Sequence, residues 1–207
     1  MNQTLFIGYK YFALLGLLLL TACVGPQGKL NDGGTTYVLR STLPQQPGYS
    51  SAAPTLLVSP MRAHPGYDTP RMAYRHEPNQ IAYYANNRWV EAPARMLTPL
   101  VTQALEASSA FGAVVQAPGT VHATLRLDTE LVNLSQDFGV QPSTMYLALR
   151  AQLVDTNTQS ILVSRLFEAS AKAGTEDARG GVEAANLLLP DVLTQLSRWA
   201  AQNVRKP

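Results

Sequence analysis

Cysteine is almost absent from this chain of 207 residues, which contains a single one, Cys23. One thiol cannot form an intramolecular disulfide, so packing alone must hold the fold together. It cannot complete a cysteine-based zinc site either, and the three histidines, His64, His76 and His122, share no ligand spacing. The sequence therefore excludes a disulfide scaffold and predicts no metal centre.

Charged residues are scarce as well. They make up 14% of the chain, compared with roughly 25% in a typical soluble domain. The formal net charge is only +2, so there is no electrostatic reason to expect nucleic acid as a partner. Hydrophobic residues make up 46% of the chain, which is enough to build the core of one ordinary domain.

Motifs that carry enzymatic chemistry are also missing. The chain has no G-x-S-x-G elbow, no Walker phosphate loop and no G-x-G-x-x-G. Asp128 and Glu130 lie two positions apart, as paired carboxylates for acid–base catalysis would on one face of a strand. They alternate with Arg126, however, which is the ordinary pattern of a solvated strand, and no nucleophile or metal ligand accompanies them. We therefore expect a protein that is not an enzyme.

Long apolar runs are lacking too. The run Tyr11–Leu20 spans ten residues, whereas a membrane-spanning helix needs about 20. It follows Lys10 and precedes small residues, which is the pattern of a secretory signal peptide. A short buried core helix is the alternative, but nothing nearby offers it a partner face. We predict that residues 1–22 are a signal peptide.

This predicted signal peptide runs into Leu20-Thr21-Ala22-Cys23, which resembles the lipobox of bacterial lipoproteins. The resemblance implies that the sulfur of Cys23 receives a diacylglyceryl group, that cleavage occurs before it, and that its new amino terminus is acylated. Two or more acyl chains anchor a protein stably, whereas one does so only marginally. We expect this covalent lipid on Cys23 and no other cofactor.

The residue after the lipobox indicates a destination. Position 24 is Val and not Asp, which under the usual enterobacterial sorting pattern favours the outer membrane of a Gram-negative bacterium, with the domain facing the periplasm. Residues 23–36 are rich in glycine and predict a flexible tether. The remaining residues, 37–203, predict a single domain.

Apolar alternation predicts the strands of this domain. In residues 121–134, Val121, Ala123, Leu125, Leu127 and Leu131 alternate with polar side chains, which is typical of a half-buried strand. Asn86-Asn87 predicts a turn, and residues 60–71 predict a loop. Further strands are predicted at residues 37–40, 55–59, 72–75, 81–84, 88–90, 145–154 and 160–169.

Apolar residues at three-to-four spacing predict two amphipathic helices, one from Pro93 and one over residues 182–204. Pro99 lies within the first, so that helix either starts late with Thr98 as its cap or starts early and bends; we favour the early start. Pro190 is expected to kink the second. The predicted fold class is α+β, a mainly antiparallel sheet with both helices packed on one face.

One segment combines aromatic and basic side chains at close spacing: Tyr83, Tyr84, Asn87, Arg88 and Trp89. Aromatic residues and arginine dominate protein interfaces because they bury much area at modest entropic cost. The segment is therefore a candidate partner-binding site. The alternative is that Trp89 and Tyr83 close the core beneath the first helix, and the sequence does not decide between the two.

Taken together, residues 36–202 resemble the ABC-type transport auxiliary lipoprotein family, which includes the lipoprotein of the paraquat-inducible intermembrane transport system. The most specific feature is Asn87-Arg88-Trp89 before Pro93 and an amphipathic helix. Pro99 and Pro190 depart from the pattern and affect only the straightness of the helices. The other matching runs are Tyr37-Val38-Leu39, Leu56-Leu57-Val58, Ile81-Ala82-Tyr83-Tyr84, Phe111 and Val114-Val115.

The resemblance implies a non-enzymatic role. Such lipoproteins work with a membrane permease, an ATPase and a mammalian-cell-entry-domain protein that move lipids or other apolar substrates across the periplasm. The domain would dock on that assembly, as a monomer or a homo-oligomer, through a sheet edge or the segment 83–89. The alternative is a lipid carrier that holds an acyl chain in an apolar groove between helix and sheet.

Overall fold

The structure is a computed structural model, and it describes residues 34–42 and 53–204. The predicted signal peptide, the lipidation site Cys23 and all but the last residues of the predicted tether lie outside the described residues. Those predictions stay predictions.

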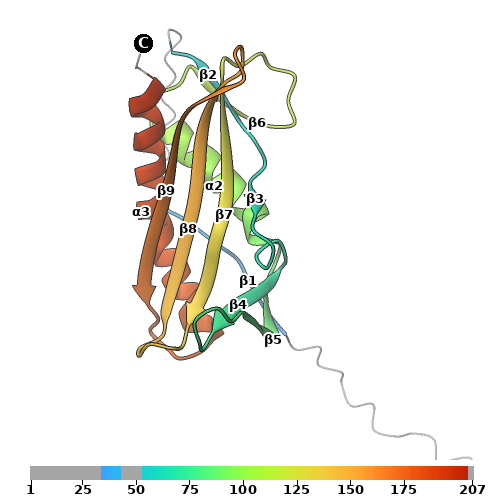
Figure 1. The fold of residues 1–207 in the computed structure, drawn as a ribbon, viewed down its shortest axis with the longest axis vertical. Helices are drawn as coiled ribbons and strands as arrows, with labels where there is room; N and C mark the ends of the chain where they lie inside the picture. Colours follow the sequence, from blue (N-terminus) through green and yellow to red (C-terminus); the bar gives the residue numbers. More distant parts are fainter. Residues whose placement is uncertain (1–33, 43–52, 205–207) are drawn as a thin grey trace, which may run out of the picture. The chain divides into compact units, whose positions relative to one another are not determined.

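The described residues form one sheet of nine strands, built around the long strand β7 (Figure 1). On one side, β7, β8 and β9 form an antiparallel meander of strands of 12 or 13 residues. On the other side, the short strands β2, β3 and β4 pair in turn with successive parts of β7, all parallel to it. The strands are β1 Thr35–Tyr37, β2 Thr55–Val58, β3 Arg62–Ala63, β4 Arg71–Arg75, β5 Ala82–Trp89, β6 Ala113–Gln116, β7 Leu125–Asp137, β8 Thr144–Asp155 and β9 Ser160–Lys172.

The remaining strands extend the edges of this sheet. β5 pairs antiparallel with β4 and parallel with β1, and β6 pairs parallel with β2. Because the two longest pairings, β7 with β8 and β8 with β9, are antiparallel, the sheet is mainly antiparallel, as the sequence predicts.

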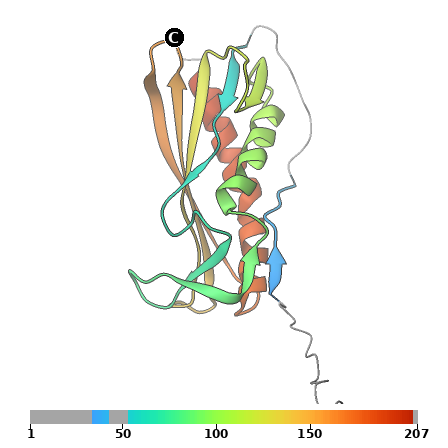
Figure 2. The ribbon, with the colours of Figure 1, turned by 90° about the vertical axis from the view of Figure 1, so that its right-hand side faces the viewer.

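Two helices cover one face of the sheet, α2 over Pro93–Ala107 and α3 over Ala178–Val204 (Figure 2). The predicted α+β class is therefore confirmed. α2 starts early, at Pro93, and contains Pro99. α3 also contains its proline, Pro190, and begins before the predicted Val182.

The core lies between this helical layer and the sheet. The apolar positions of β7 and β8 point toward the helices because side chains alternate along a strand, and the matching stripes of α2 and α3 meet them. Phe167 of β9 packs edge-on against Trp199 of α3, with ring centroids 5.6 Å apart. Side chains with no exposed surface include Leu56, Val58, Leu97, Val101, Leu105, Leu127, Leu131, Leu149, Leu153, Leu193 and Leu196.

Four local predictions are wrong. The alternation starting at Val121 does not begin a strand: Val121 is exposed and β7 begins at Leu125. The loop predicted at 60–71 contains the short strand β3. Asn86-Asn87 is not a turn, because β5 continues to Trp89, and its pairing with β4 instead shifts register between Arg71 and Ala73. This irregularity absorbs extra residues in β5 where the sequence signals a chain reversal.

The fourth error concerns the first strand, which is Thr35–Tyr37 rather than residues 37–40. The residues that follow leave the sheet and dock on α3. The backbone N–H of Arg40 donates to the side-chain oxygen of Asn186, 2.9 Å away, and Leu39 is buried. Such long-range partners cannot be read from local alternation.

Candidate partner-binding surface

The five residues predicted to bind a partner lie along β5, between β4 and β1. The structure therefore brings them onto one strand, but not onto one accessible surface. The register shift opposite Arg71 and Ala73 breaks the simple alternation of faces, so each side chain has to be placed individually.

Trp89 belongs to the core. It is 2% exposed, and its backbone N–H donates to the carbonyl oxygen of Pro70 over 2.7 Å. For this residue the alternative suggested by the sequence holds, and its ring is not accessible to a partner.

Tyr83 is half-buried against the loop that precedes β4. Its hydroxyl donates to the carbonyl oxygen of Gly66 over 3.0 Å, and the guanidinium of Arg71 lies 3.8 Å from the centre of its ring. Gly66 has φ +99°, a conformation that L side chains rarely adopt. Glycine is therefore the residue that suits this backbone conformation.

Tyr84 is tied into a buried polar network. Its hydroxyl donates to Oε1 of Gln136 over 2.9 Å, and Nε2 of Gln136 donates to Oγ of Ser143, also over 2.9 Å. Gln136 is 1% exposed. Burial, with smaller contributions from Asp177 and Tyr74, raises the pKa of Tyr84 above its ordinary value. Tyr84 is therefore a neutral hydrogen-bond donor that holds β5 against the end of β7.

Arg88 is exposed and Asn87 is half-buried; they pair with Thr36 and Thr35 of β1. On the other side of β5, Arg88 pairs with Arg71 of β4. Of the five candidates, Arg88 is therefore exposed, Tyr83, Tyr84 and Asn87 are half-buried, and Trp89 is the one that a partner could not reach.

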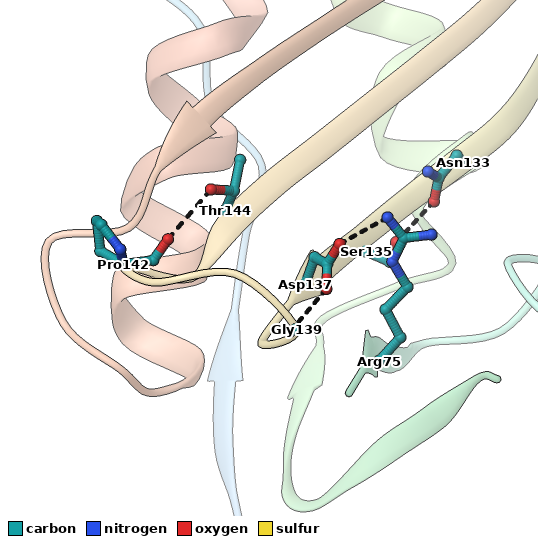
Figure 3. Close-up of polar contacts among 7 residues, drawn as sticks. All are labelled: Arg75, Asn133, Ser135, Asp137, Gly139, Pro142 and Thr144. Carbon is teal, nitrogen blue, oxygen red and sulfur yellow. Dashed lines mark hydrogen bonds and ion pairs between the residues drawn. The ribbon is translucent and has the colours of Figure 1, made fainter. Parts of the chain in front are cut away.

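The end of β7 is joined to β4 by an ion pair that the sequence did not signal (Figure 3). Nη2 of Arg75 lies 2.6 Å from Oδ2 of Asp137, whose side chain is 11% exposed. The other carboxylate oxygen of Asp137 accepts the backbone N–H of Gly139 over 2.8 Å. Asp137 therefore fixes both the turn after β7 and the position of β4. The only sequence signal for this pair would have been the register between two strands 62 positions apart.

Aromatic rings continue this junction on the neighbouring turns. Phe138 stacks edge-on against Tyr74 with ring centroids 5.8 Å apart, and lies 5.3 Å from His76. The turn between β4 and β5 and the turn between β7 and β8 are thereby held side by side.

The sheet face opposite the helices is polar and carries two shallow grooves of about 260 and 320 Å³. The carboxylate of Asp128 accepts two hydrogen bonds from the guanidinium of Arg126, from Nε over 2.9 Å and from Nη2 over 3.0 Å. It also accepts one from the hydroxyl of Ser59 over 2.6 Å. Glu130 pairs with Arg150 over 3.1 Å and with His64 over 3.5 Å. The carboxylates of Asp128 and Glu130 are therefore each neutralised by an arginine side chain.

The pKa of Asp128 reflects these contacts. Burial alone would raise it, but the hydrogen bonds from Arg126 and Ser59 outweigh burial and hold the pKa below the ordinary value. A carboxylate held ionised and paired is a poor general acid. The structure thus supports the interpretation of Asp128 and Glu130 as members of a solvated, ion-paired strand face.

Within the part of the chain that the structure describes, no group of three or more His, Cys, Asp or Glu side chains is placed to hold a metal ion. Over the same residues, no helix is long and apolar enough to cross a membrane.

The fold and the surface together define an α+β domain in which a long antiparallel meander is backed by two helices and the carboxylates Asp128 and Glu130 of the open face are paired with arginines. A family model described as ABC-type transport auxiliary lipoprotein component matches residues 37–197. The chain belongs to this family. The resemblance inferred from the sequence is thereby confirmed, and with it a role as an auxiliary lipoprotein of an ABC-type transport system in the bacterial cell envelope.

Solved structures show the same fold. A protein from Xanthomonas campestris, XCC0632, superposes with a TM-score of 0.73 at 23% identity, over 82% of this chain and 95% of that one. An uncharacterised protein superposes with a TM-score of 0.58 at 14% identity, over 81% and 99% of the two chains. At these identities the likeness concerns the fold alone. No curated protein matches the sequence significantly.

Proposed function

We propose that this protein is a non-enzymatic, lipid-anchored auxiliary component of an intermembrane transport system that moves lipids or other apolar solutes. Its partners would be a mammalian-cell-entry-domain protein, a permease and an ATPase, and ATP hydrolysis would belong to the partner. The observation that carries the proposal is the family match over residues 37–197. The paired state of Asp128 and Glu130 supports a docking role over a catalytic one.

The anchor is Cys23, acylated after removal of residues 1–22 and inserted in the outer membrane, with no other cofactor. A Cys23→Ser variant should be released from the membrane fraction, because the thiol that receives the lipid is gone. Mass spectrometry of the N-terminal peptide gives the direct measurement. A mature terminus without acyl mass would contradict the anchor.

The docking contact includes the accessible part of β5. An Arg88→Ala variant should capture the mammalian-cell-entry-domain protein at least several-fold less well, because interface arginines contribute strongly to binding. Arg198→Ala is the matched control, since Arg198 is also exposed but lies on α3. Equal capture by both variants and the parent would remove Arg88 from the interface. Homo-oligomerisation belongs to the same proposal and is measured by light scattering.

Direct carriage of an acyl chain is the alternative function. It needs a continuous apolar cavity between helix and sheet, whereas fully buried leucine and valine side chains such as Leu97, Val101 and Leu127 fill that interface. Docking is therefore the function that the packing favours. Organic extraction of the purified protein tests the alternative directly, since a carrier should yield stoichiometric lipid.

A further inference from the structure

The strand β9 forms one edge of the sheet. It pairs with β8 from Ser160 to Lys172, and no other strand of the described residues pairs with it. Figure 1 shows it as the last strand on its side of the sheet. In an antiparallel pair, every second residue directs its backbone N–H and C=O away from the neighbouring strand. β9 therefore presents a row of backbone donors and acceptors along its outer side.

β9 lacks most of the features that keep an edge strand from pairing. It contains no proline, and its only register shift with β8 lies near its start, between the partners of Val163 and Ile161. From Val163 to Lys172 the pairing is regular. Three of the eight exposed large apolar side chains of the described residues also lie on this strand. A long and apolar edge strand of this kind is a site where another strand pairs. The three side chains are Ile161, Leu162 and Leu166.

The length of this edge indicates which strand covers it. An extended strand is the partner that satisfies a row of backbone groups. The strands at the ends of the other part of the sheet, β1 and β6, have three and four residues, so either would cover less than half of the regular segment 163–172. The β9 of a second copy offers an edge of the same length. Two-fold symmetry, the commonest in homo-oligomers, would pair the two copies of β9 antiparallel.

The side chains then select one register. In an antiparallel pair with two-fold symmetry, directly opposite residues share a face, so one residue lies opposite its own copy. Seven or more residues of the regular segment pair only when this central residue is Leu166, Phe167, Glu168 or Ala169. Centring on Glu168 puts two carboxylates directly opposite each other, which is unfavourable. Centring on Phe167 or Ala169 puts the exposed Leu166 opposite a charged group, Glu168 or Lys172. Centring on Leu166 pairs the two leucines.

We propose that two copies of this chain join through β9, antiparallel and centred on Leu166, so that their sheets become one continuous sheet. Leu166 then lies against Leu166 of the second copy, and Ser164 lies opposite Glu168. The inference rests on the homo-oligomerisation in the proposed function and assigns a surface to it. The docking strand β5 lies on the other side of β7, so pairing through β9 leaves Arg88 free for the transport partner.

Disulfide cross-linking of the full-length protein in detergent tests this contact. Leu166→Cys should form a disulfide dimer under mild oxidation, because directly opposite Cα atoms lie about 4.5–5.5 Å apart, within the range that a disulfide spans. Ile81→Cys is the matched control, since Ile81 is 44% exposed and Leu166 is 41% exposed but Ile81 precedes β5. The yield of dimer should be at least about fivefold higher for Leu166→Cys. The parent, whose single cysteine is Cys23, sets the background.

Two further cysteine variants test the register. Ser164→Cys and Glu168→Cys should not cross-link alone, because each residue would lie four positions, or about 13 Å, from its own copy along the pair. The two variants co-expressed with different tags should cross-link with each other. A yield for Leu166→Cys no higher than for Ile81→Cys would overturn the inference. Self-cross-linking of Ser164→Cys or Glu168→Cys at the level of Leu166→Cys would also overturn it.

A lysine variant gives a second measurement that needs no thiol. Leu166→Lys would place two ammonium groups opposite each other, and should halve the protein mass that light scattering gives for the parent. Leu187→Lys is the control, because Leu187 is 71% exposed but lies on α3, and it should leave the mass unchanged.

The parent separates the surface from the oligomer itself. A parent that is monomeric by light scattering would overturn both the homo-oligomerisation and this inference. If the parent is oligomeric, and neither Leu166→Lys changes its mass nor Leu166→Cys cross-links above the control, the homo-oligomerisation stands and β9 is not its surface. The capture experiment with Arg88→Ala tests docking on the transport partner independently of either result.

Discussion

The hydroxyl of Tyr84 donates a hydrogen bond of 2.9 Å to Oε1 of Gln136, which lies 52 positions further along the chain. This contact joins β5 to the end of β7, and Nε2 of Gln136 in turn donates to Oγ of Ser143, the residue that precedes β8. One buried amide thus connects β5, β7 and the turn between β7 and β8.

Removing the Tyr84 hydroxyl tests the strength of this junction. Tyr84→Phe leaves Oε1 of Gln136 buried without its donor, which costs about 1–3 kcal/mol of unfolding free energy. Tyr83→Phe is the control, because its lost bond goes to a backbone oxygen in a half-buried loop, and it should cost about 1 kcal/mol. Urea denaturation of both variants gives the comparison, and equal costs would contradict the special role of Tyr84.

The raised pKa of Tyr84 also predicts a response to alkali. Above pH about 10 the unfolded tyrosine ionises while the folded one stays neutral, so stability declines as the pH rises past that point. Tyr84→Phe should lack this part of the decline, which denaturation curves at pH 8 and above pH 10 would show as a smaller loss.

Gly181 of α3 faces the same amide. A Cβ at this position would overlap Oε1 of Gln136 and come 2.9 Å from its Cδ. Gly181→Ala should therefore destabilise the protein by about 1–3 kcal/mol, because Gln136 is held at both ends and cannot move without losing hydrogen bonds. In a Gln136→Ala background the obstacle is gone, and the same change should stabilise by up to about 1 kcal/mol, since alanine favours a helix over glycine. A double-mutant cycle by urea denaturation measures the difference.

If Gly181→Ala lowers the free energy of unfolding equally in the parent and in the Gln136→Ala background, Gln136 is not the group with which the alanine side chain clashes. Gly174→Ala controls for generic effects of replacing glycine, because a Cβ at Gly174 meets nothing within 4 Å.

The lowered pKa of Asp128 predicts that the stability of the protein falls in acid. The folded pKa of Asp128 is lowered, so its contribution to stability is present above the unfolded value of about 4 and is lost as the pH falls below it. At pH 7, Asp128→Asn should cost about 1 kcal/mol or less, because the pair with Arg126 is partly exposed. The difference between variant and parent should shrink at pH 3. A difference that stays constant between the two pH values would contradict the lowered pKa.

Trp89 and Arg88 are neighbours in sequence, but replacing each by alanine should affect the stability of the protein very differently. Trp89→Ala removes a core ring that is 2% exposed and should cost about 3–5 kcal/mol. Arg88→Ala changes an exposed side chain and should stay within about 0.5 kcal/mol of the parent. Thermal denaturation measures both. A stable Trp89→Ala variant would show that the ring does not close the core.

The long strands show which features the local sequence pattern predicts correctly. In β7, Leu127 and Leu131 are fully buried while Arg126 and Asp128 face the open side, as alternation predicts. The partner-binding segment shows the limit. Alternation cannot tell that Trp89 is buried, since the register shift opposite β4 changes which face the later residues of β5 occupy.

The sequence by itself determined the α+β class, the two helices and the long meander, because each depends on a hydrophobic period that short windows contain. It also predicted the family. Only the tertiary structure decided where β1 ends, which members of the segment 83–89 reach solvent, and that Arg75, Tyr84, Gln136 and Asp137 form one junction. Those features depend on strand pairs and helix contacts between residues far apart in the chain, and no local period encodes the register that brings them together.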